Sequence, residues 1–391
     1  MTDRPLDGLK VIDITHVLAG PYCTYQLGLL GAEIIKIESL RGDMVRVWGG
    51  TQEQLAAGVG TGFAPQNAGK QSIAVDIHTA AGTAIVADLI KGADIVVENF
   101  RPGAMAKHKL DYETMHVDNP GLIYVSISAF GQNGPEGHRP GFDDVVQATS
   151  GFMSINERGD GPIRTGGPVL DYATGMQAAS AVLAAVLMKL KTGEGQHIDI
   201  AMQDVTMLLL NRNSSITATT GMPPPPGGNH DGFLLGRYSS KDGYVMLAGY
   251  RASHQRKICA AIGLEEYSRL STQELGTKHA KIEAAVAGKL LEKTSTEWDK
   301  VFSEHAVVGG GVRDMAEVLA SGQPAERKLF SKVNSPAGDF EVTNAGYQIN
   351  GRVFTPQSGI PALGEHTTTV LAGMGYSDGA IQRLREKRVV K

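Results

Sequence analysis

The feature that most constrains the fold is an alternation of short apolar runs with helical stretches in the first third of the chain. Runs rich in Val and Ile, bounded by polar loops, are typical of buried strands. Strands that alternate with helices predict a mostly parallel, doubly wound sheet, the Rossmann-like α/β class. The predicted strands are Leu9–Thr15, Glu33–Glu38, Asp94–Phe100 and Leu122–Ser128, with a helix near Ala80–Ile90.

A run of four prolines within Gly221–Gly232 divides the chain. Consecutive prolines neither continue a helix nor occupy a central strand, so this segment is interpreted as a linker or active-site loop. We therefore expect residues 1–222 to form a large domain and residues 223–321 a smaller α+β domain. Residues 322–391 are expected to return to the first domain and complete it.

Charge and cysteine content exclude several classes of function. The formal net charge of −4 gives no basic surface for nucleic acid or an acidic membrane. Two cysteines, Cys23 and Cys259, show neither pairing nor metal spacing, which favours a reducing, cytoplasmic location. We expect no signal peptide, no membrane-spanning stretch and no metal site. The loop HVLAGPY has one glycine where a dinucleotide fingerprint needs three, so no dinucleotide is expected there.

Asp171 stands between a Gly-Gly-Pro turn and an apolar stretch that is predicted to be a helix as far as about Leu190. Asp is favoured at helix N-caps, so capping is the ordinary interpretation. The alternative is a carboxylate that acts as a covalent nucleophile. The two roles are compatible, because a helix N-terminus supplies N–H groups and a positive dipole end, which we expect to keep the carboxylate ionised.

Several motifs, in their order and spacing, carry a resemblance to a known family. They include VIDITHVLAGPY, LGLLGAEIIKIE, RGDMVR, ADIVVENFRPGAM, PGFDDVVQATSG and LDYATGM followed by TGEGQHIDIAMQD. Together they make the chain similar, over nearly its whole length, to the family III CoA-transferases of the CaiB–BaiF group. The resemblance implies an interlocked homodimer, with no permanently bound cofactor and with an acyl-CoA thioester and a carboxylic acid as substrates.

The resemblance also implies a mechanism in which Asp171 is the nucleophile. The carboxylate attacks the thioester and forms an acyl–aspartyl anhydride with release of CoA thiolate. The thiolate then attacks the aspartyl carbonyl, which gives an enzyme–CoA thioester, and the acceptor acid reverses the sequence. Covalent catalysis of this kind replaces one difficult step with several easier ones.

Site residues follow from the same resemblance. For the acid it implies His16, Leu18, Gln132, Gly227 and Gly228. Because Leu18 replaces a glutamine of the oxalate enzyme, and only two glycines remain of a run of four there, oxalate is not expected. We expect succinyl-CoA or a short acyl-CoA as donor and a dicarboxylate of about four or five carbons as acceptor. The implied CoA-binding residues are Arg41, Val75, Asp76, His78, Asn99, Phe100, Arg101, Lys107, Ser128, Ala129, Phe130 and Gly131, with Arg46 as a further candidate.

Two rival interpretations remain. A 2-methylacyl-CoA racemase of the same fold needs two acid–base groups that flank the α-carbon. The resemblance places one of them, a histidine, where this chain has Phe142, which cannot carry a proton. The other rival is a non-catalytic CoA-binding protein, and the intact block around Asp171 argues against it.

Overall fold

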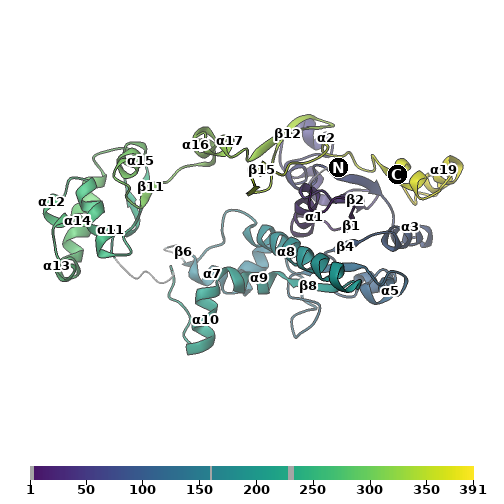
Figure 1. The fold of residues 1–391 in the computed structure, drawn as a ribbon, viewed down its shortest axis with the longest axis horizontal. Coiled ribbons are helices and arrows are strands. Elements are labelled where there is room, and N and C mark those ends of the chain that lie inside the picture. Colours follow the sequence, from purple (N-terminus) through teal and green to yellow (C-terminus); the bar gives the residue numbers. More distant parts are fainter. Residues whose placement is uncertain (1–3, 159–160, 228–232) are drawn as a thin grey trace. The chain divides into compact units, whose positions relative to one another are not determined.

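The structure is a computed structural model that describes residues 4–158, 161–227 and 233–391. The chain divides into two compact units (Figure 1), one made of Met1–Gly227 with Ala325–Lys391 and the other of Gly228–Pro324. The boundaries expected at 222 and 321 lie within a few residues of this division. The assignment of residues 1–222 with 322–391 as a CoA-binding domain, and of residues 223–321 as a small domain, stays a prediction.

A six-stranded sheet organises the larger unit, in the order β3-β2-β1-β4-β5-β8. Every neighbouring pair is parallel, as the alternation of strands and helices predicts. The strand order reverses between β1 and β4, and open α/β sheets bind ligands at this switch point, outside the carboxyl ends of the strands. The strands are β1 (Lys10–Ile14), β2 (Glu33–Glu38), β3 (Gln71–Ala74), β4 (Ile95–Glu98), β5 (Ile123–Ser128) and β8 (His197–Ala201).

Successive strand residues enter two separate hydrophobic cores, because side chains alternate between the faces of a sheet. Val11 of β1 belongs to the first core and Ile12 to the second. Helices α1 (Ala19–Leu29) and α8 (Val169–Thr192) contribute to the first core, and α3 (Ala80–Lys91) contributes to the second. The C-terminal segment also contributes to the second core through Leu371, Ile381, Val389 and Val390.

Helices α1 and α8 lie side by side (Figure 1) and approach closely at a glycine. A Cβ atom on Gly175 would lie 2.6 Å from the carbonyl oxygen of Ala19, closer than such contacts allow. A side chain at this position would therefore push the two helices apart. Because Ala19 is the first residue of α1, this contact brings the N-terminus of α1 next to the second turn of α8.

Helix α8 corrects one expectation from the sequence. Its 24 residues are long and apolar enough to cross a membrane by length and composition, so the expectation that no such stretch exists was wrong. However, Leu170, Ala178 and Val182 of α8 are buried in the first core. A single helix of this kind is weak support for membrane insertion, and no membrane protein is indicated.

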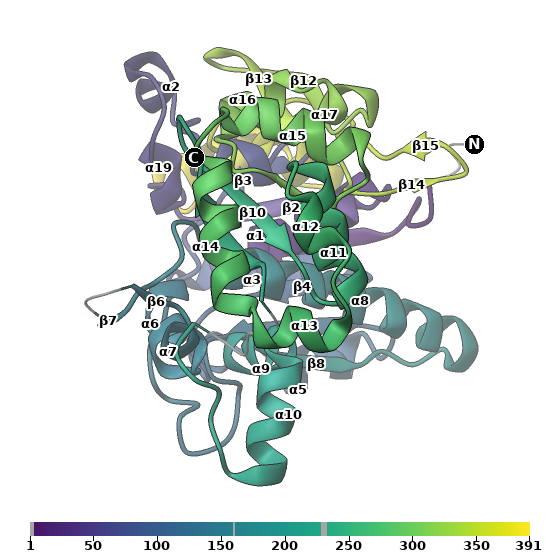
Figure 2. The same ribbon diagram turned by 90° about the vertical axis from the view of Figure 1, so that its left-hand side faces the viewer.

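The smaller unit is built on an antiparallel sheet of β9 (Leu235–Ser239), β10 (Tyr244–Ala248) and β11 (Gly309–Gly311). Figure 2 shows this unit facing the viewer, with helices α11 (Ala252–Ala261) and α14 (His279–Leu290) around β10. Its core contains Trp298 and Phe302 of α15 (Ser295–Glu304). A capping box between Thr294 and Glu297 begins α15.

Shorter elements complete the chain. In the larger unit these are η1 (Met44–Val47), α2 (Gln52–Ala56), η2 (Ala64–Gln66), α4 (Ala104–Lys107), α5 (Tyr112–Asp118), α6 (Asp143–Thr149), α7 (Phe152–Ile155), β6 (Glu157–Arg158), β7 (Gly161–Pro162), α9 (Met202–Leu209), α10 (Asn211–Thr220), β12 (Phe330–Ser335), β13 (Gly338–Thr343), β14 (Gln348–Ile349), β15 (Arg352–Val353), α18 (Thr367–Gly373) and α19 (Asp378–Glu386). The others are α12 (Glu265–Ser268), α13 (Thr272–Thr277), α16 (Met315–Ala320) and α17 (Gln323–Glu326).

Candidate active site

A small cavity lies at the switch point of the sheet, beyond the carboxyl ends of β1, β4 and β5. It brings together residues that are far apart in the sequence and that sequence analysis assigned to both substrates. The loop after β1, the loop after β4, the end of β5 and the first turn of α8 all contribute to its wall. The predicted site residues that line it are His16, Leu18, Asn99, Ser128, Ala129 and Asp171.

Asp171 does not cap its own helix, so the capping interpretation is wrong. Helix α8 begins at Val169, with Pro168 at the N-cap, and Asp171 is therefore the third helical residue. The carboxylate of Asp143 caps the helix instead, since its Oδ2 accepts the N–H groups of Leu170 at 2.7 Å and of Asp171 at 3.0 Å. The Asp171 side chain accepts a hydrogen bond from the backbone N–H of Ala19.

The protonation of Asp171 also differs from the expectation. Burial raises the pKa of this carboxyl to about 7, and the negative charges of Asp143 and Asp144 add to the effect. The bond from Ala19 lowers the pKa, but it does not outweigh burial. The helix N-terminus therefore does not keep the carboxylate fully ionised at neutral pH. A strongly perturbed carboxyl in a cavity is typical of a functional site.

The loop after β1 presents His16 to the cavity. Asn99 holds the backbone of His16 from both sides, because Asn99 Nδ2 donates to the His16 carbonyl at 2.7 Å and the His16 N–H donates to Asn99 Oδ1 at 2.9 Å. The imidazole packs against the ring of Phe100, with 5.0 Å between ring centroids. Burial lowers the pKa of His16, which favours the neutral imidazole at pH 7.

A second cavity, of about 300 Å³, lies at the ends of β1 and β2. Its wall includes Thr15, His16, Ser39, Gly42 and Phe100. Because His16 lines both cavities, the second one adjoins the cavity of Asp171. The two cavities together follow the carboxyl edge of the sheet across its switch point.

Several predicted CoA-binding residues lie outside both cavities. The rings of His78 and His108 are 5.1 Å apart, which places the end of β3 beside the end of α4, where Lys107 is exposed. Arg41 is exposed in a turn, and Asp76 Oδ1 accepts the N–H of His78. Two other members are buried, Val75 in the second core and Phe130 in the first. Gly131, directly after Phe130, has a φ of 88°.

Arg46 is not free to bind a phosphate. Its guanidinium forms a buried ion pair with Glu38 at 2.6 Å and lies over the ring of Phe63. The Gly227 N–H donates to the carbonyl of Ile155, away from both cavities described above. Gly228, the other glycine expected near the acid, lies outside the described residues.

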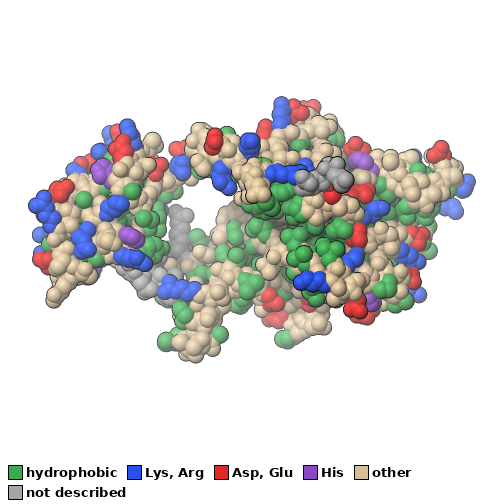
Figure 3. Space-filling view, in the orientation of Figure 1, with side chains coloured by type: hydrophobic (Ala, Val, Ile, Leu, Met, Phe, Trp, Pro, Cys, Tyr) green, Lys and Arg blue, Asp and Glu red, His purple; other side chains and the backbone are tan. Residues whose placement is uncertain are grey.

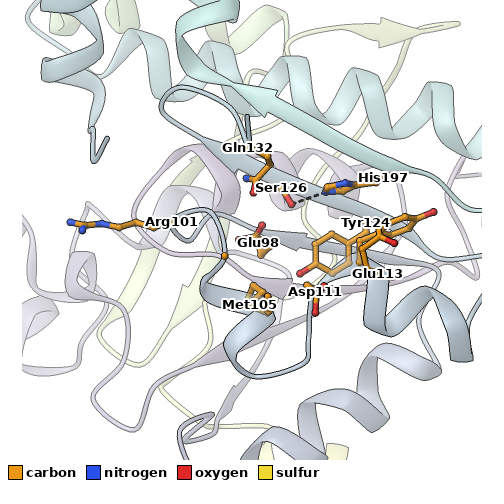
Figure 4. A pocket seen from close by; sticks show the side chains of 12 residues that line it. Glu98, Arg101, Met105, Asp111, Glu113, Tyr124, Ser126, Gln132 and His197 are labelled. Carbon is orange, nitrogen blue, oxygen red and sulfur yellow. Dashed lines mark hydrogen bonds between the residues drawn. The ribbon is translucent and has the colours of Figure 1, made fainter. Parts of the chain in front are cut away.

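Arg101 and Gln132 line a third cavity, of about 200 Å³, which also contains Glu98, Ser126 and His197 (Figure 4). Burial raises the pKa of Glu98 to about 7, although Glu98 accepts hydrogen bonds from Ser126 and from the N–H of Phe100. Ser126 Oγ lies 3.0 Å from His197 Nε2. The carboxylate contacts the serine rather than the histidine, so these groups do not form a hydrolase triad.

Sequence analysis missed Ala19 and Asp143, which contact Asp171, and the cluster around Glu98. Asp143 and Asp144 form an acidic pair in the motif PGFDD. The contact of Asp143 with Asp171 could not be predicted, because the two residues lie far apart in the sequence. Glu98 was visible at the end of a predicted strand, where α/β proteins place functional groups. Among the described residues, no group of three His, Cys, Asp or Glu side chains could hold a metal ion.

Comparison with known proteins gives concordant results. The model of CoA-transferase family III matches residues 6–367. A succinate–glutarate CoA-transferase of Agrobacterium fabrum is 35% identical over 95% of this chain and 97% of its own length. Succinyl-CoA:mesaconate CoA-transferase of Haloarcula marismortui is 33% identical over 96% and 97%. Acetyl-CoA:oxalate CoA-transferase of Acetobacter aceti is 33% identical over 84% and 86%.

The fold is similar as well. A CaiB/BaiF family protein from Brucella suis superposes with a TM-score of 0.84 at 30% identity, covering 95% of this chain and 99% of the other. The family model spans far more than half of the chain, and the relatives match along most of its length. The chain is therefore a CoA-transferase and belongs to family III, the CaiB/BaiF family.

Proposed function

We propose that the protein moves CoA from an acyl-CoA to a small dicarboxylate through covalent intermediates on Asp171. The observation that carries this proposal is the environment of Asp171: a buried carboxyl in a cavity at the switch point, whose side chain is not used to cap its own helix. A carboxyl that only stabilised α8 would accept the free N–H groups at the start of the helix. Asp143 accepts two of these instead, those of Leu170 and Asp171.

In the proposed reaction, ionised Asp171 attacks the thioester carbonyl. The C–S bond breaks, CoA leaves as a thiolate and the acyl group remains on Asp171 as an anhydride. The thiolate then attacks the aspartyl carbonyl, the donor acid leaves as its carboxylate, and CoA is held as an aspartyl thioester. The acceptor carboxylate reverses both steps. The N–H of Ala19 holds one carboxyl oxygen and thereby directs the other toward the thioester.

We propose that CoA lies along the carboxyl edge of the sheet. The cavity beside Ser39, Gly42 and Phe100 suits the pantetheine arm, since it leads to Asp171 past His16. The exposed cation of Lys107, with His78 and His108 nearby, suits the phosphates. Arg41 is a further exposed cation after β2, whereas Arg46 is already paired.

For the acid we propose a body of about four or five carbons with a second carboxylate. Leu18, Phe142 and Met202 give the cavity of Asp171 apolar walls, which suit a short hydrocarbon body. The names of the Agrobacterium and Haloarcula relatives support glutarate- or mesaconate-like acids, with succinyl-CoA as donor. The Acetobacter relative makes oxalate the competitor to test.

The racemase alternative has less support. Phe142 lies in the same cavity as Asp171, where the rival mechanism would need a proton carrier. The rival of a non-catalytic CoA-binding protein is excluded by the family assignment.

We also propose that the protein is a cytoplasmic homodimer. Figure 3 shows hydrophobic side chains open to solvent on the larger unit. A large apolar surface on a single subunit marks an interaction site. Sedimentation at low micromolar concentration tests the dimer, and a monomer there would refute it. The exposed apolar residues of α8 and α9 include Met176, Leu187, Met188, Leu190, Leu208 and Leu209.

The mechanism is tested by trapping. Incubation with succinyl-CoA alone, followed by hydroxylamine and peptide mass spectrometry, should mark Asp171 in the wild type and mark nothing in Asp171→Asn. An acid-panel assay with succinate, glutarate, mesaconate, oxalate and an aromatic acid identifies the acceptor. A preference for oxalate would overturn the substrate proposal and leave the transferase assignment intact.

A further inference from the structure

The loop between β1 and α1, residues 15–18, is held by polar side chains from three other parts of the chain. Lys36 Nζ, from β2, donates to the carbonyl of Thr15 at 2.8 Å. Asn99, after β4, bonds both backbone groups of His16. Asp43, before η1, accepts the N–H of Val17 with Oδ2 at 3.0 Å. The backbone on either side of His16 is therefore fixed by groups that are not themselves on the loop.

Val17 has an unusual backbone conformation. Its φ is 67°, in the left-handed region that β-branched residues rarely adopt. Residues held in this region persist only where the surroundings impose it, and they cluster at functional sites. The Val17 side chain is buried in the first core, so its burial and the bond to Asp43 both act against the intrinsic preference of the backbone.

The turn at Val17 decides where Ala19 points. Leu18 is the N-cap of α1, and Ala19 is the first helical residue, whose N–H has no partner within the helix. That N–H donates to Asp171. If Val17 relaxed to an ordinary extended conformation, the chain would enter α1 in another direction. Gly20, packed against Thr15, and Gly175, packed against Ala19, leave little space for adjustment.

We propose that Asp43 is a positioning residue, which holds Val17 in its left-handed conformation so that the start of α1 presents the Ala19 N–H to Asp171. The proposal rests on the proposed role of Asp171 as nucleophile. Asp43 is itself well fixed: its side chain is almost fully buried, Lys36 Nζ lies 3.8 Å from Oδ2, and the Asp43 N–H donates to Glu38. Asp43 lines the second cavity, where we place the pantetheine arm, and not the cavity of Asp171. We propose that it acts on Asp171 through the loop.

The experiment is a double-mutant cycle between Asp43 and Val17. Asp43→Ala removes the acceptor, and we expect kcat to fall by about tenfold or more, with a much smaller change in KM for the acyl-CoA. Asp43→Asn keeps one acceptor oxygen, so its kcat should lie between the values of the wild type and of Asp43→Ala. Glycine adopts positive φ readily, so in the Val17→Gly background Asp43→Ala should cost less than about threefold in kcat. This partial rescue is the signature of a conformational role.

Ser72→Ala is the matched control. Ser72 donates to Glu38, the residue that accepts the Asp43 N–H. Its other side-chain and backbone hydrogen bonds shown here run to Gly364 and His366, not to residues 15–18. We expect this variant to lower the melting temperature and to leave kcat unchanged. If Asp43→Ala instead lowered only the melting temperature, as Ser72→Ala does, or cost the same in both Val17 backgrounds, the positioning role would be refuted.

Trapping separates failure of this proposal from failure of the mechanism. Hydroxylamine marking of wild-type Asp171, together with no rescue in the cycle, would refute the role of Asp43 alone. No marking in the wild type, together with full activity of Asp171→Asn, would refute the nucleophile and with it the reason for positioning. Marking in the wild type that slows in Asp43→Ala and recovers in the double variant supports both.

Discussion

Two buried carboxyls of the larger unit have the same raised pKa but different surroundings. Burial raises the pKa of both Asp171 and Glu98 to about 7. Glu98 accepts hydrogen bonds from the hydroxyl of Ser126 and from the N–H of Phe100, two residues along the chain. Ser126 also contacts His197 (Figure 4). Asp171 receives one N–H from another helix and faces a second carboxylate, Asp143. A perturbed pKa alone therefore does not identify a nucleophile. Asp171 differs in lining the cavity that also contains His16 and Leu18, and in accepting one hydrogen bond where Glu98 accepts two.

The largest effect is expected for Asp171→Asn. The amide keeps the size of the side chain but cannot form the anhydride, so kcat should fall by about four orders of magnitude or more. Steady-state CoA transfer measures this, after mass spectrometry has excluded deamidation. Near-normal turnover of Asp171→Asn, or an equally large loss of activity in Glu98→Gln, would contradict the assignment of Asp171 as the nucleophile.

The pH dependence of kcat separates the two carboxyls. The nucleophile must be ionised, so kcat should rise with pH and level off above the pKa of Asp171, about 7. Below that pH, kcat should fall by about tenfold per unit. A limb near pH 7 that persists in Glu98→Gln assigns the titration to Asp171. If the limb disappears in Glu98→Gln, the titration belongs to Glu98 and not to Asp171.

Stability should show the opposite pH trend. A carboxyl whose folded pKa is raised binds its proton more tightly when folded, so stability is lost as pH rises from the unfolded value of 3.8 toward about 7. At pH 8, Asp171→Asn removes a buried negative charge beside Asp143 and should raise the melting temperature by about 2–4 °C. The gain should vanish at pH 4, where the wild-type carboxyl is protonated. Thermal unfolding at both values checks this, and an equal gain at pH 4 would contradict it.

His16→Ala should have a smaller effect. The imidazole lines both cavities and is kept neutral by burial, and the carboxylates and the thiolate need no general base. We expect a loss of about 10- to 100-fold in kcat/KM through positioning of the acyl group. A loss equal to that of Asp171→Asn, with disappearance of a limb of the pH profile, would make His16 an acid–base catalyst instead.

The smallest effect on activity is expected for Glu98→Gln. The amide oxygen can still accept the N–H of Phe100, so the loop that carries Asn99 should stay in place. We expect kcat to change by less than about threefold, since Glu98 lies outside the cavity of Asp171. Glu98→Ala is the stronger test of stability, because it leaves the partly buried N–H of Phe100 without its acceptor and should cost about 1 kcal/mol or more. A large loss of kcat in Glu98→Gln would show that the third cavity takes part in catalysis.

The sheet pattern was readable from the sequence, and the motifs singled out Asp171 as the predicted nucleophile. The predicted strand Glu33–Glu38 coincides with β2, and Leu9–Thr15 exceeds β1 by one residue at each end. These features were readable because periodicity and motif order are local properties of the chain. The strand β3 was missed, because a run of four residues carries little periodic signal.

The surroundings of Asp171 were set by tertiary contacts that the local sequence does not reveal. The helix start at Val169, the cap from Asp143 and the N–H from Ala19 each depend on a residue remote in sequence. The raised pKa of Asp171 and the left-handed Val17 follow from burial and from charges that other segments bring close. A local pattern carries the propensity of a residue, whereas desolvation and electrostatic interactions depend on distances that exist only once the chain has folded.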